Sequence, residues 1–131
     1  MKVLALDYGL ARTGVAVSDA TGTLARPLTV VERASSQAGL RRLAELVSAE
    51  GVERVVVGLP LTLRGEPGLQ AQETERFLES LRGAVDVPVE SFDERFTTTL
   101  AAQAPSSRAP EDARAAAHLL ESYLTWTAGR G

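Results

Sequence analysis

The sequence predicts an α/β fold with a central mixed five-stranded sheet flanked by helices, in the order β-β-β-α-β-α-β-α. Two apolar runs joined by a Gly-containing turn open the chain, over Val3–Leu6 and Thr13–Ser18, which is typical of an antiparallel hairpin. Helical and strand patterns then alternate to the end of the chain, as in parallel strands joined by helices. Val52–Leu61 is apolar at nearly every position, which indicates a strand covered on both faces.

Periodicity and cap signals predict the remaining elements. Ser35 or Ser36 caps a helix that Gly51 ends. The other expected elements are a strand at Leu28–Val31, a helix at Leu69–Arg82, a strand at Val87–Phe92, a helical segment at Thr97–Gln103 and a last helix at Pro110–Thr127. Functional sites in such folds lie at the carboxyl ends of parallel strands, which is where Asp7 stands.

Length and composition limit the class of protein. The 131 residues suffice for one domain with a core, so we expect a single domain over residues 1–131. A hydrophobic fraction of 44% without a long apolar run predicts a globular chain and no membrane span. Met1 and Lys2 lead straight into a strand and cysteine is absent, from which we expect a cytoplasmic protein without disulfides. The net charge of −3 gives no overall sign of nucleic-acid binding.

Asp7 is the first candidate site residue, because it ends an apolar strand and directly precedes a turn. Strand alternation places it on the same face as Val3 and Ala5, toward whatever covers the sheet. Gly9 in the turn would let backbone and phosphate approach closely. A carboxylate here can also simply accept hydrogen bonds from the amides of the turn, and the position alone does not separate the two roles.

Two further acidic positions lie beside predicted helix starts. Asp93 and Glu94 follow the Val87–Phe92 strand, where a helix start explains them equally well. Asp112 lies in the first turn of the last helix, where it would favour the helix dipole. The expected apolar stripe of that helix is Ala116, Leu119, Tyr123 and Trp126, and its expected solvent side is Glu111, Arg114, His118 and Glu121. Asp112 continues the apolar stripe, where an unpaired charge is costly, so it needs a cation.

Carboxylates that converge at one end of a sheet repel each other and raise their own pKa values. A divalent cation removes that repulsion, and Mg²⁺ or Mn²⁺ prefers oxygen ligands. Zinc is disfavoured because cysteine is absent and the single histidine, His118, is expected on the solvent side. Metal ions held by carboxylates and completed by substrate phosphates suit phosphodiester hydrolysis, since they activate water and stabilise the leaving oxygen.

Four segments of the chain carry a family resemblance. They are LALDYGLARTGVAVSD, VVVGLPLTLRGEPG, FDERFTT and EDARAAAHLLESYL, in that order. Together they resemble the YqgF/RuvX-type family of RNase H-like proteins, described as Holliday junction resolvases and pre-16S ribosomal RNA nucleases. The resemblance covers nearly the whole chain. It implies an RNase H-like fold and a metal-dependent endonuclease acting in 5′-end processing of pre-16S rRNA, in Holliday junction resolution, or in both.

The same resemblance implies roles for individual residues. The catalytic and metal-binding set that it implies for Mg²⁺ or Mn²⁺ is Asp7, Asp93, Glu94 and Asp112, and the sequence leaves open whether Asp93 or Glu94 binds the metal. The set implied to face nucleic acid or to order the site is Arg12, Arg95, Thr97 and Thr98. The chain departs from the family pattern in two places: Ala11 stands where a lysine often precedes the motif arginine, and Arg108–Pro110 replace the lysines common before the last aspartate.

Arg64 is a further candidate for nucleic-acid binding, on a different ground. It lies in the Gly- and Pro-containing loop Leu63–Gly68, which joins the carboxyl end of the Val52–Leu61 strand to a helix. Loops at that end of a sheet are well placed to contact bound strands.

Two other classes of protein fit part of the sequence. DYGLARTG also resembles the phosphate-binding hairpin of actin-like and sugar-kinase ATPases, but those proteins need a second domain for which 131 residues leave no room. A non-catalytic nucleic-acid-binding or transcription-factor-binding module would keep the fold without the chemistry, and metal-dependent cleavage separates the two. Junction resolution needs two coordinated cuts, which a homodimer would supply, and the sequence does not distinguish an RNA precursor from a DNA junction.

Overall fold

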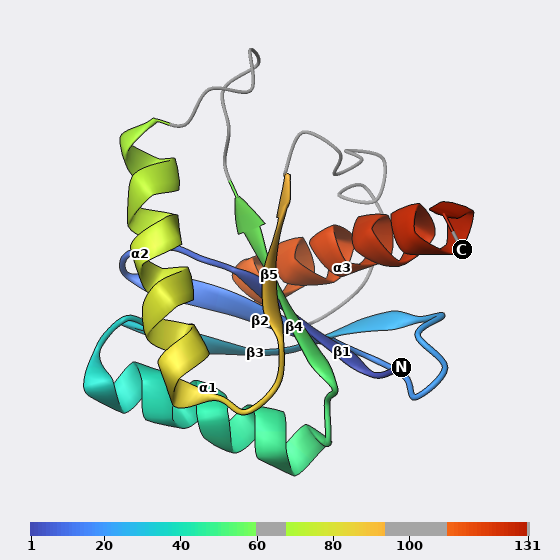
Figure 1. Ribbon diagram of the computed structural model, residues 1–131, viewed down its shortest axis with the longest axis horizontal. Helices are drawn as coiled ribbons and strands as arrows, with labels where there is room; N and C mark the ends of the chain where they lie inside the picture. The colour runs from blue at the N-terminus through green and yellow to red at the C-terminus, as the bar shows by residue number, and fades with distance from the viewer. Residues whose placement is uncertain (60–67, 94–109, 131) are drawn as a thin grey trace.

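The computed structural model describes residues 1–59, 68–93 and 110–130, with side chains as far as residue 128 (Figure 1). Over these residues the element order is β-β-β-α-β-α-β-α, so the predicted α/β class and order are confirmed. The elements are β1 Val3–Asp7, β2 Arg12–Ser18, β3 Ala25–Glu32, α1 Gln37–Glu50, β4 Arg54–Leu59, α2 Leu69–Ala84, β5 Val89–Asp93 and α3 Glu111–Arg130. The helical segment expected at 97–103 and the Arg64 loop lie outside the described residues.

The five strands form one mixed sheet in the order β3-β2-β1-β4-β5. The hairpin strands β1, β2 and β3 pair antiparallel, whereas β4 pairs parallel to both β1 and β5. The carboxyl ends of β1, β4 and β5 therefore lie along one end of the sheet. Asp7 is the last residue of β1, and Asp93 is the last residue of β5.

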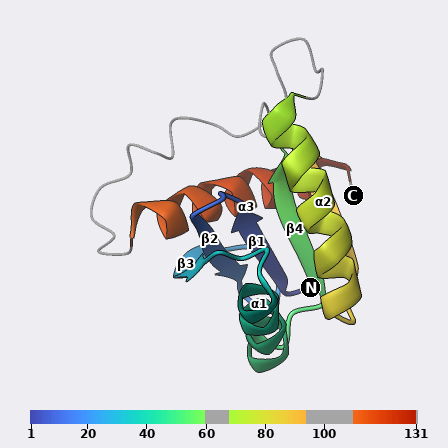
Figure 2. The same ribbon diagram turned by 90° about the vertical axis from the view of Figure 1, so that its left-hand side faces the viewer.

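Helices cover both faces of the sheet. Helices α1 and α2 lie on one face, and α3 crosses the other, chiefly over β1, β2 and β3 (Figure 2). Successive residues of β4 serve the two layers, because Val55 and Val57 belong to the α1/α2 core and Val56 to the α3 core. This alternation confirms the prediction of a strand apolar on both faces. No helix in the described ranges is long and apolar enough to cross a membrane.

Helix α1 has the ends that the sequence predicts. The Ser36 hydroxyl accepts a hydrogen bond from the Gly39 amide at 3.0 Å, which satisfies one of the free amides of the first turn. Gly51 closes the helix in the left-handed conformation, with φ of 65°. The backbone of Gly39 also packs against Arg33 and Ala34, where a β-carbon would come within 2.2 Å of the Arg33 carbonyl oxygen.

Helix α3 departs from the expected division into an apolar and a solvent side. Glu111 and Glu121 are exposed as expected, but Arg114 and His118 are half-buried. The helix lies across three strands, so a wider arc of its surface is covered than one stripe accounts for. Arg114 Nε and His118 Nδ1 are buried and have no hydrogen-bond partner within the described ranges. The expectation that His118 lies on the solvent side of the helix is therefore wrong.

Candidate active site

The candidate site is built where the carboxyl end of β1 meets the first turn of α3. Asp7 is paired in register with Gly14 of β2, so the two residues point to the same face of the sheet. That face is the α3 face, because Val3, Ala5 and Ala16, which alternate with the same period, all belong to the core beneath α3. The prediction that Asp7 points toward the layer covering the sheet agrees with this register.

Gly14 brings α3 into contact with the strand next to Asp7. A β-carbon built on Gly14 would lie 1.7 Å from the carbonyl oxygen of Asp112 and 3.0 Å from the amide nitrogen of Ala113. The backbone of Asp112 thus rests directly on β2. Residues paired across antiparallel strands have β-carbons about 5 Å apart, so the start of α3 lies within roughly one strand spacing of Asp7.

An ion pair joins the first residue of β2 to the same helix. Arg12 Nε lies 3.3 Å from Asp112 Oδ2, and the side chains are 66% and 38% exposed, respectively. Asp112 was expected to need a cation, and in the described residues Arg12 provides a positive charge for it. Most of the Arg12 side chain remains open to solvent.

Asp93 shares the end of the sheet with Asp7 but not its face. In β5, Phe92 belongs to the α3 core, whereas Val89 belongs to the α1/α2 core and Ser91 borders α2. Alternation along the strand therefore places Asp93 on the α2 side. Asp93 pairs with Leu59 of β4, and β4 separates it from β1.

The remaining predicted site residues, Glu94, Arg64, Arg95, Thr97 and Thr98, lie outside the described residues. Within the described ranges, no group of three or more acidic or histidine side chains is arranged to hold a metal ion. Asp7 and Asp112 supply hard oxygen donors from adjoining elements, which is the chemistry that Mg²⁺ and Mn²⁺ prefer. These two residues fit such an ion if a further oxygen ligand comes from another carboxylate or from a substrate phosphate.

In the structure, Gly9 is required by packing within the turn between β1 and β2, whereas the sequence suggested that it lets a phosphate approach. A β-carbon at Gly9 would lie 2.5 Å from the Arg12 carbonyl oxygen, so the turn itself requires glycine. The Thr13 hydroxyl closes the turn, with 3.4 Å separations from both the amide nitrogen and the carbonyl oxygen of Gly9. Close packing within the chain therefore accounts for Gly9 without a bound phosphate.

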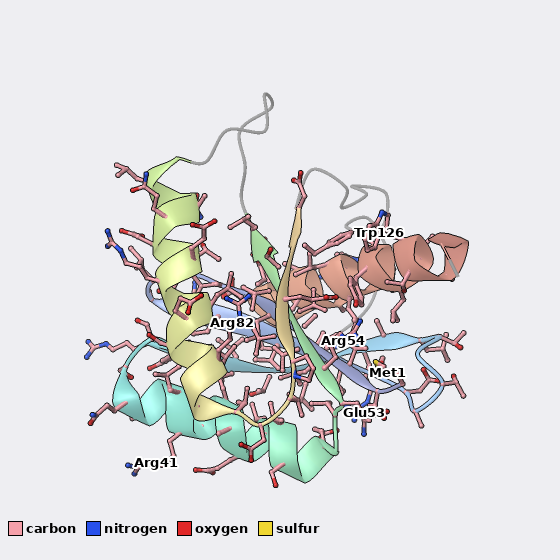
Figure 3. All side chains as sticks on the ribbon, in the orientation of Figure 1. Met1, Arg41, Glu53, Arg54, Arg82 and Trp126 are labelled. Carbon is pink, nitrogen blue, oxygen red and sulfur yellow. The ribbon has the colours of Figure 1, made fainter. Side chains whose placement is uncertain are left out.

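A polar cluster holds the second half of α3 against β4 and β5. Arg54 Nη1 donates a hydrogen bond to the Tyr123 hydroxyl at 3.0 Å, and that hydroxyl donates to Glu90. Burial, followed by the hydrogen bond to Glu90, raises the pKa of Tyr123. Trp126 packs edge-on against Phe92, with ring centroids 5.7 Å apart (Figure 3, where Arg54 and Trp126 are labelled). These contacts fix the helix whose first turn carries Asp112.

Sequence reasoning missed Gly14 as a residue of the site. The signal was present, because a glycine interrupts a strand of otherwise branched and small apolar residues directly opposite Asp7 in the hairpin. A glycine within a strand commonly marks the close approach of another backbone. Here that backbone is the first turn of α3.

The fold belongs to the RuvC-like class of RNase H folds. The chain superposes on the structure titled "T. thermophilus RuvC in complex with Holliday junction substrate" with a TM-score of 0.71, covering 100% of this chain and 96% of that one. The sequence identity is 19%, so this likeness establishes the fold. The resemblance to an RNase H-like fold is thereby confirmed.

Sequence comparison gives the family. The model described as "RuvX: Holliday junction resolvase" matches residues 1–126. A Rubrobacter xylanophilus protein named "Putative pre-16S rRNA nuclease" is 47% identical over 130 residues, covering 94% of this chain and 91% of its own. A protein of the same name from Chloroflexus aurantiacus is 44% identical over 130 residues, covering 93% and 85%. The chain therefore belongs to the RuvX family, as its four motifs indicate.

Proposed function

We propose that the protein is a divalent-metal-dependent endonuclease that hydrolyses phosphodiester bonds of structured nucleic acid. The observation that carries the proposal is the approach of the Asp112 backbone to Gly14, the cross-strand partner of Asp7. Two acidic residues from elements far apart in sequence thereby lie near the carboxyl end of β1. Family membership supports the same class of chemistry.

In this proposal Asp7 and Asp112 hold Mg²⁺ or Mn²⁺ together with a carboxylate from the acidic pair at 93–94. Glu94 is the stronger candidate of that pair, because Asp93 belongs to the α2 side of the sheet. A bound ion would lower the pKa of the attacking water and stabilise the leaving oxygen. Arg12 both steadies Asp112 and presents its exposed guanidinium to a substrate phosphate, for which its planar fork is suited.

The nucleic-acid-binding set in the proposal also includes Arg64, Arg95, Thr97 and Thr98. The names of the curated relatives favour a ribosomal RNA precursor, with cleavage at the 5′ end of pre-16S rRNA. The family description favours a Holliday junction, for which a homodimer would make two symmetric cuts. Either substrate would place the protein in the cytoplasm.

The test is a cleavage assay on synthetic four-way junctions, flaps, duplexes and structured ribosomal RNA precursors, each with Mg²⁺, with Mn²⁺ and with chelator. We expect cleavage of at least one structured substrate with metal and none with chelator. Asp7→Asn should abolish that cleavage while the protein stays folded, or becomes slightly more stable because carboxylate repulsion is relieved. Cleavage at the wild-type rate by folded Asp7→Asn protein would exclude Asp7 as a catalytic residue.

A non-catalytic nucleic-acid-binding or transcription-factor-binding module is the second candidate. Such a module would bind the same structured substrates without cutting them under any metal condition. The cleavage assay, read alongside binding of the same substrates, separates the two functions.

A further inference from the structure

A cavity of about 360 Å³ lies beside the candidate active site, on the α2 side of the carboxyl end of β1. Its walls come from the turn after β1 and from the first turns of α2. The lining residues are Tyr8, Gly9, Leu10, Leu69, Gln70 and Glu73. Tyr8 directly follows Asp7, so a wall of the cavity and the candidate metal ligand are adjacent in the chain.

The aromatic wall of the cavity is rigid. The Tyr8 ring stacks on Phe77 of α2, with centroids 4.3 Å apart and ring planes 12° from parallel. Phe77 is only 1% exposed, so one face of Tyr8 is fixed against the core. The part of Tyr8 that lines the cavity is therefore its other face or its edge, held in place before any ligand arrives.

The rim of the cavity exposes two large apolar side chains. Leu10 is 66% exposed and Leu69 is 81% exposed, and they belong to different elements on either side of the opening. Exposed apolar side chains gathered around a cavity favour a flat or apolar ligand. A purine or pyrimidine ring bound between Tyr8 and the two leucines would bury the exposed side chains of Leu10 and Leu69.

The polar groups of the cavity fit a base better than a phosphate. Gln70 and Glu73 stand three residues apart on α2 and so share a face of the helix. Among the described residues, no lysine or arginine lines the cavity, and the charge of Glu73 would repel a phosphate. A carboxylate does accept hydrogen bonds from the amino groups of bases, and an amide can bond a base edge with both its donor and its acceptor.

We propose that this cavity receives an unpaired nucleobase of the substrate strand, flanking the phosphate at Asp7. The inference rests on the proposed function and specifies its substrate: the bound strand must carry an unstacked nucleotide next to the cleavage position. The base stacks against Tyr8 between Leu10 and Leu69, and Glu73 accepts a hydrogen bond from an amino group. Adenine, cytosine and guanine are therefore favoured over uracil and thymine, which have no amino group.

The test is binding, in chelator, of labelled oligonucleotides that are fully paired or that carry one bulged nucleotide, in RNA and DNA versions. We expect the bulged guanine oligonucleotide to bind about tenfold more tightly than the paired control, with bulged uracil between them. Comparing the RNA and DNA versions shows whether the protein prefers ribose or deoxyribose in the bound strand. A second readout is 2-aminopurine fluorescence at the bulge, which changes when the base leaves the helix and stacks on Tyr8.

Three variants connect this binding to the cavity. Leu10→Ser and Tyr8→Leu should remove the preference for the bulge while leaving binding of the paired duplex unchanged. Leu10 is exposed, so that variant keeps the test decisive if Tyr8→Leu fails to fold. Glu73→Gln should weaken the preference for guanine over uracil, because its amide can also donate a hydrogen bond to a uracil carbonyl. Glu75→Gln, an exposed acid on α2 that does not line this cavity, is the matched control and should match wild type.

The outcomes distinguish this inference from the proposed function. Equal binding of bulged and paired oligonucleotides by the wild-type protein would overturn the inference, even if metal-dependent cleavage is present. A bulge preference that survives both Leu10→Ser and Tyr8→Leu would also overturn it. A bulge preference lost in these variants supports base capture, even if no substrate is cleaved and the endonuclease proposal fails.

Discussion

The carbonyl oxygen of Asp112 occupies the space that a side chain on Gly14 would fill, 1.7 Å from the position of its β-carbon. Gly14 is in turn the register partner of Asp7 across the β1–β2 hairpin. A single missing methyl group therefore sets how closely the first turn of α3 approaches the end of the central strand. The packing of the α3 backbone on Gly14 therefore affects how Asp112 is placed relative to Asp7.

Gly14→Ala should move the start of α3 away from β2 and separate Asp112 from Asp7. Overpacking of this kind costs about 1–3 kcal/mol, and we expect that loss in the free energy of unfolding measured with urea. The cleavage rate should fall by more than the loss of folded protein accounts for, because the variant moves the Asp112 carboxylate away from Asp7. Gly83→Ala is the matched control: nothing lies within 4 Å of its β-carbon in α2, so it should match or exceed wild-type stability. A fully stable Gly14→Ala protein with normal cleavage would contradict this account.

The sequence predicts the fold more completely than the site. Helix α1 shows why: Ser36 and Gly51 are local signals whose effect needs no distant partner. The placement of Asp93 depends instead on which face of β5 each core takes, and this is decided by α2 and α3 packing from opposite sides. The half-burial of His118 likewise follows from the crossing of α3 over several strands, which periodicity along one helix does not contain.

Asp19 should make folding sensitive to acid. In the turn between β2 and β3, its carboxylate accepts hydrogen bonds from the Thr21 hydroxyl and then from the amides of Leu24 and Thr23, which lower its pKa from 3.8 to about 2. Because the folded pKa lies below the unfolded value, this stabilisation is present above pH 3.8 and is lost as the pH falls toward 2. Urea midpoints of wild type and Asp19→Ala should converge over that interval. A gap that stays constant with pH would contradict the assignment.

Asp93 and Glu94 should separate in a cleavage assay, although the two acids are adjacent in sequence. Asp93 alternates with Phe92 and so belongs to the α2 side, away from the face that Asp7 shares with α3. We expect Asp93→Asn to retain most metal-dependent cleavage and Glu94→Gln to lose most of it. Rates at saturating Mn²⁺ for both variants give the comparison. Equal loss in the two variants would mean that both carboxylates serve the site.

Asp112 and Glu111 test whether the start of α3 is a site or only a helix end. Both acids lie in the first turn, so each favours the helix dipole by about 0.3–1 kcal/mol. Only Asp112 also contacts Arg12, and an ion pair this exposed adds about 0.2–1 kcal/mol. Asp112→Asn and Glu111→Gln should therefore differ little in the free energy of unfolding.

Their cleavage rates should differ far more, because only the backbone of Asp112 rests on Gly14 beside Asp7, whereas Glu111 is exposed. We expect Asp112→Asn to lose most activity and to bind Mn²⁺ more weakly in a direct titration, with partial rescue at high Mn²⁺. Glu111→Gln should cleave and bind metal nearly as wild type does. If both variants cleave normally, Asp112 is a helix-start acid paired with Arg12. If both variants are equally impaired, cleavage depends on the total negative charge at the start of α3. It would then not depend on the specific position of the Asp112 carboxylate.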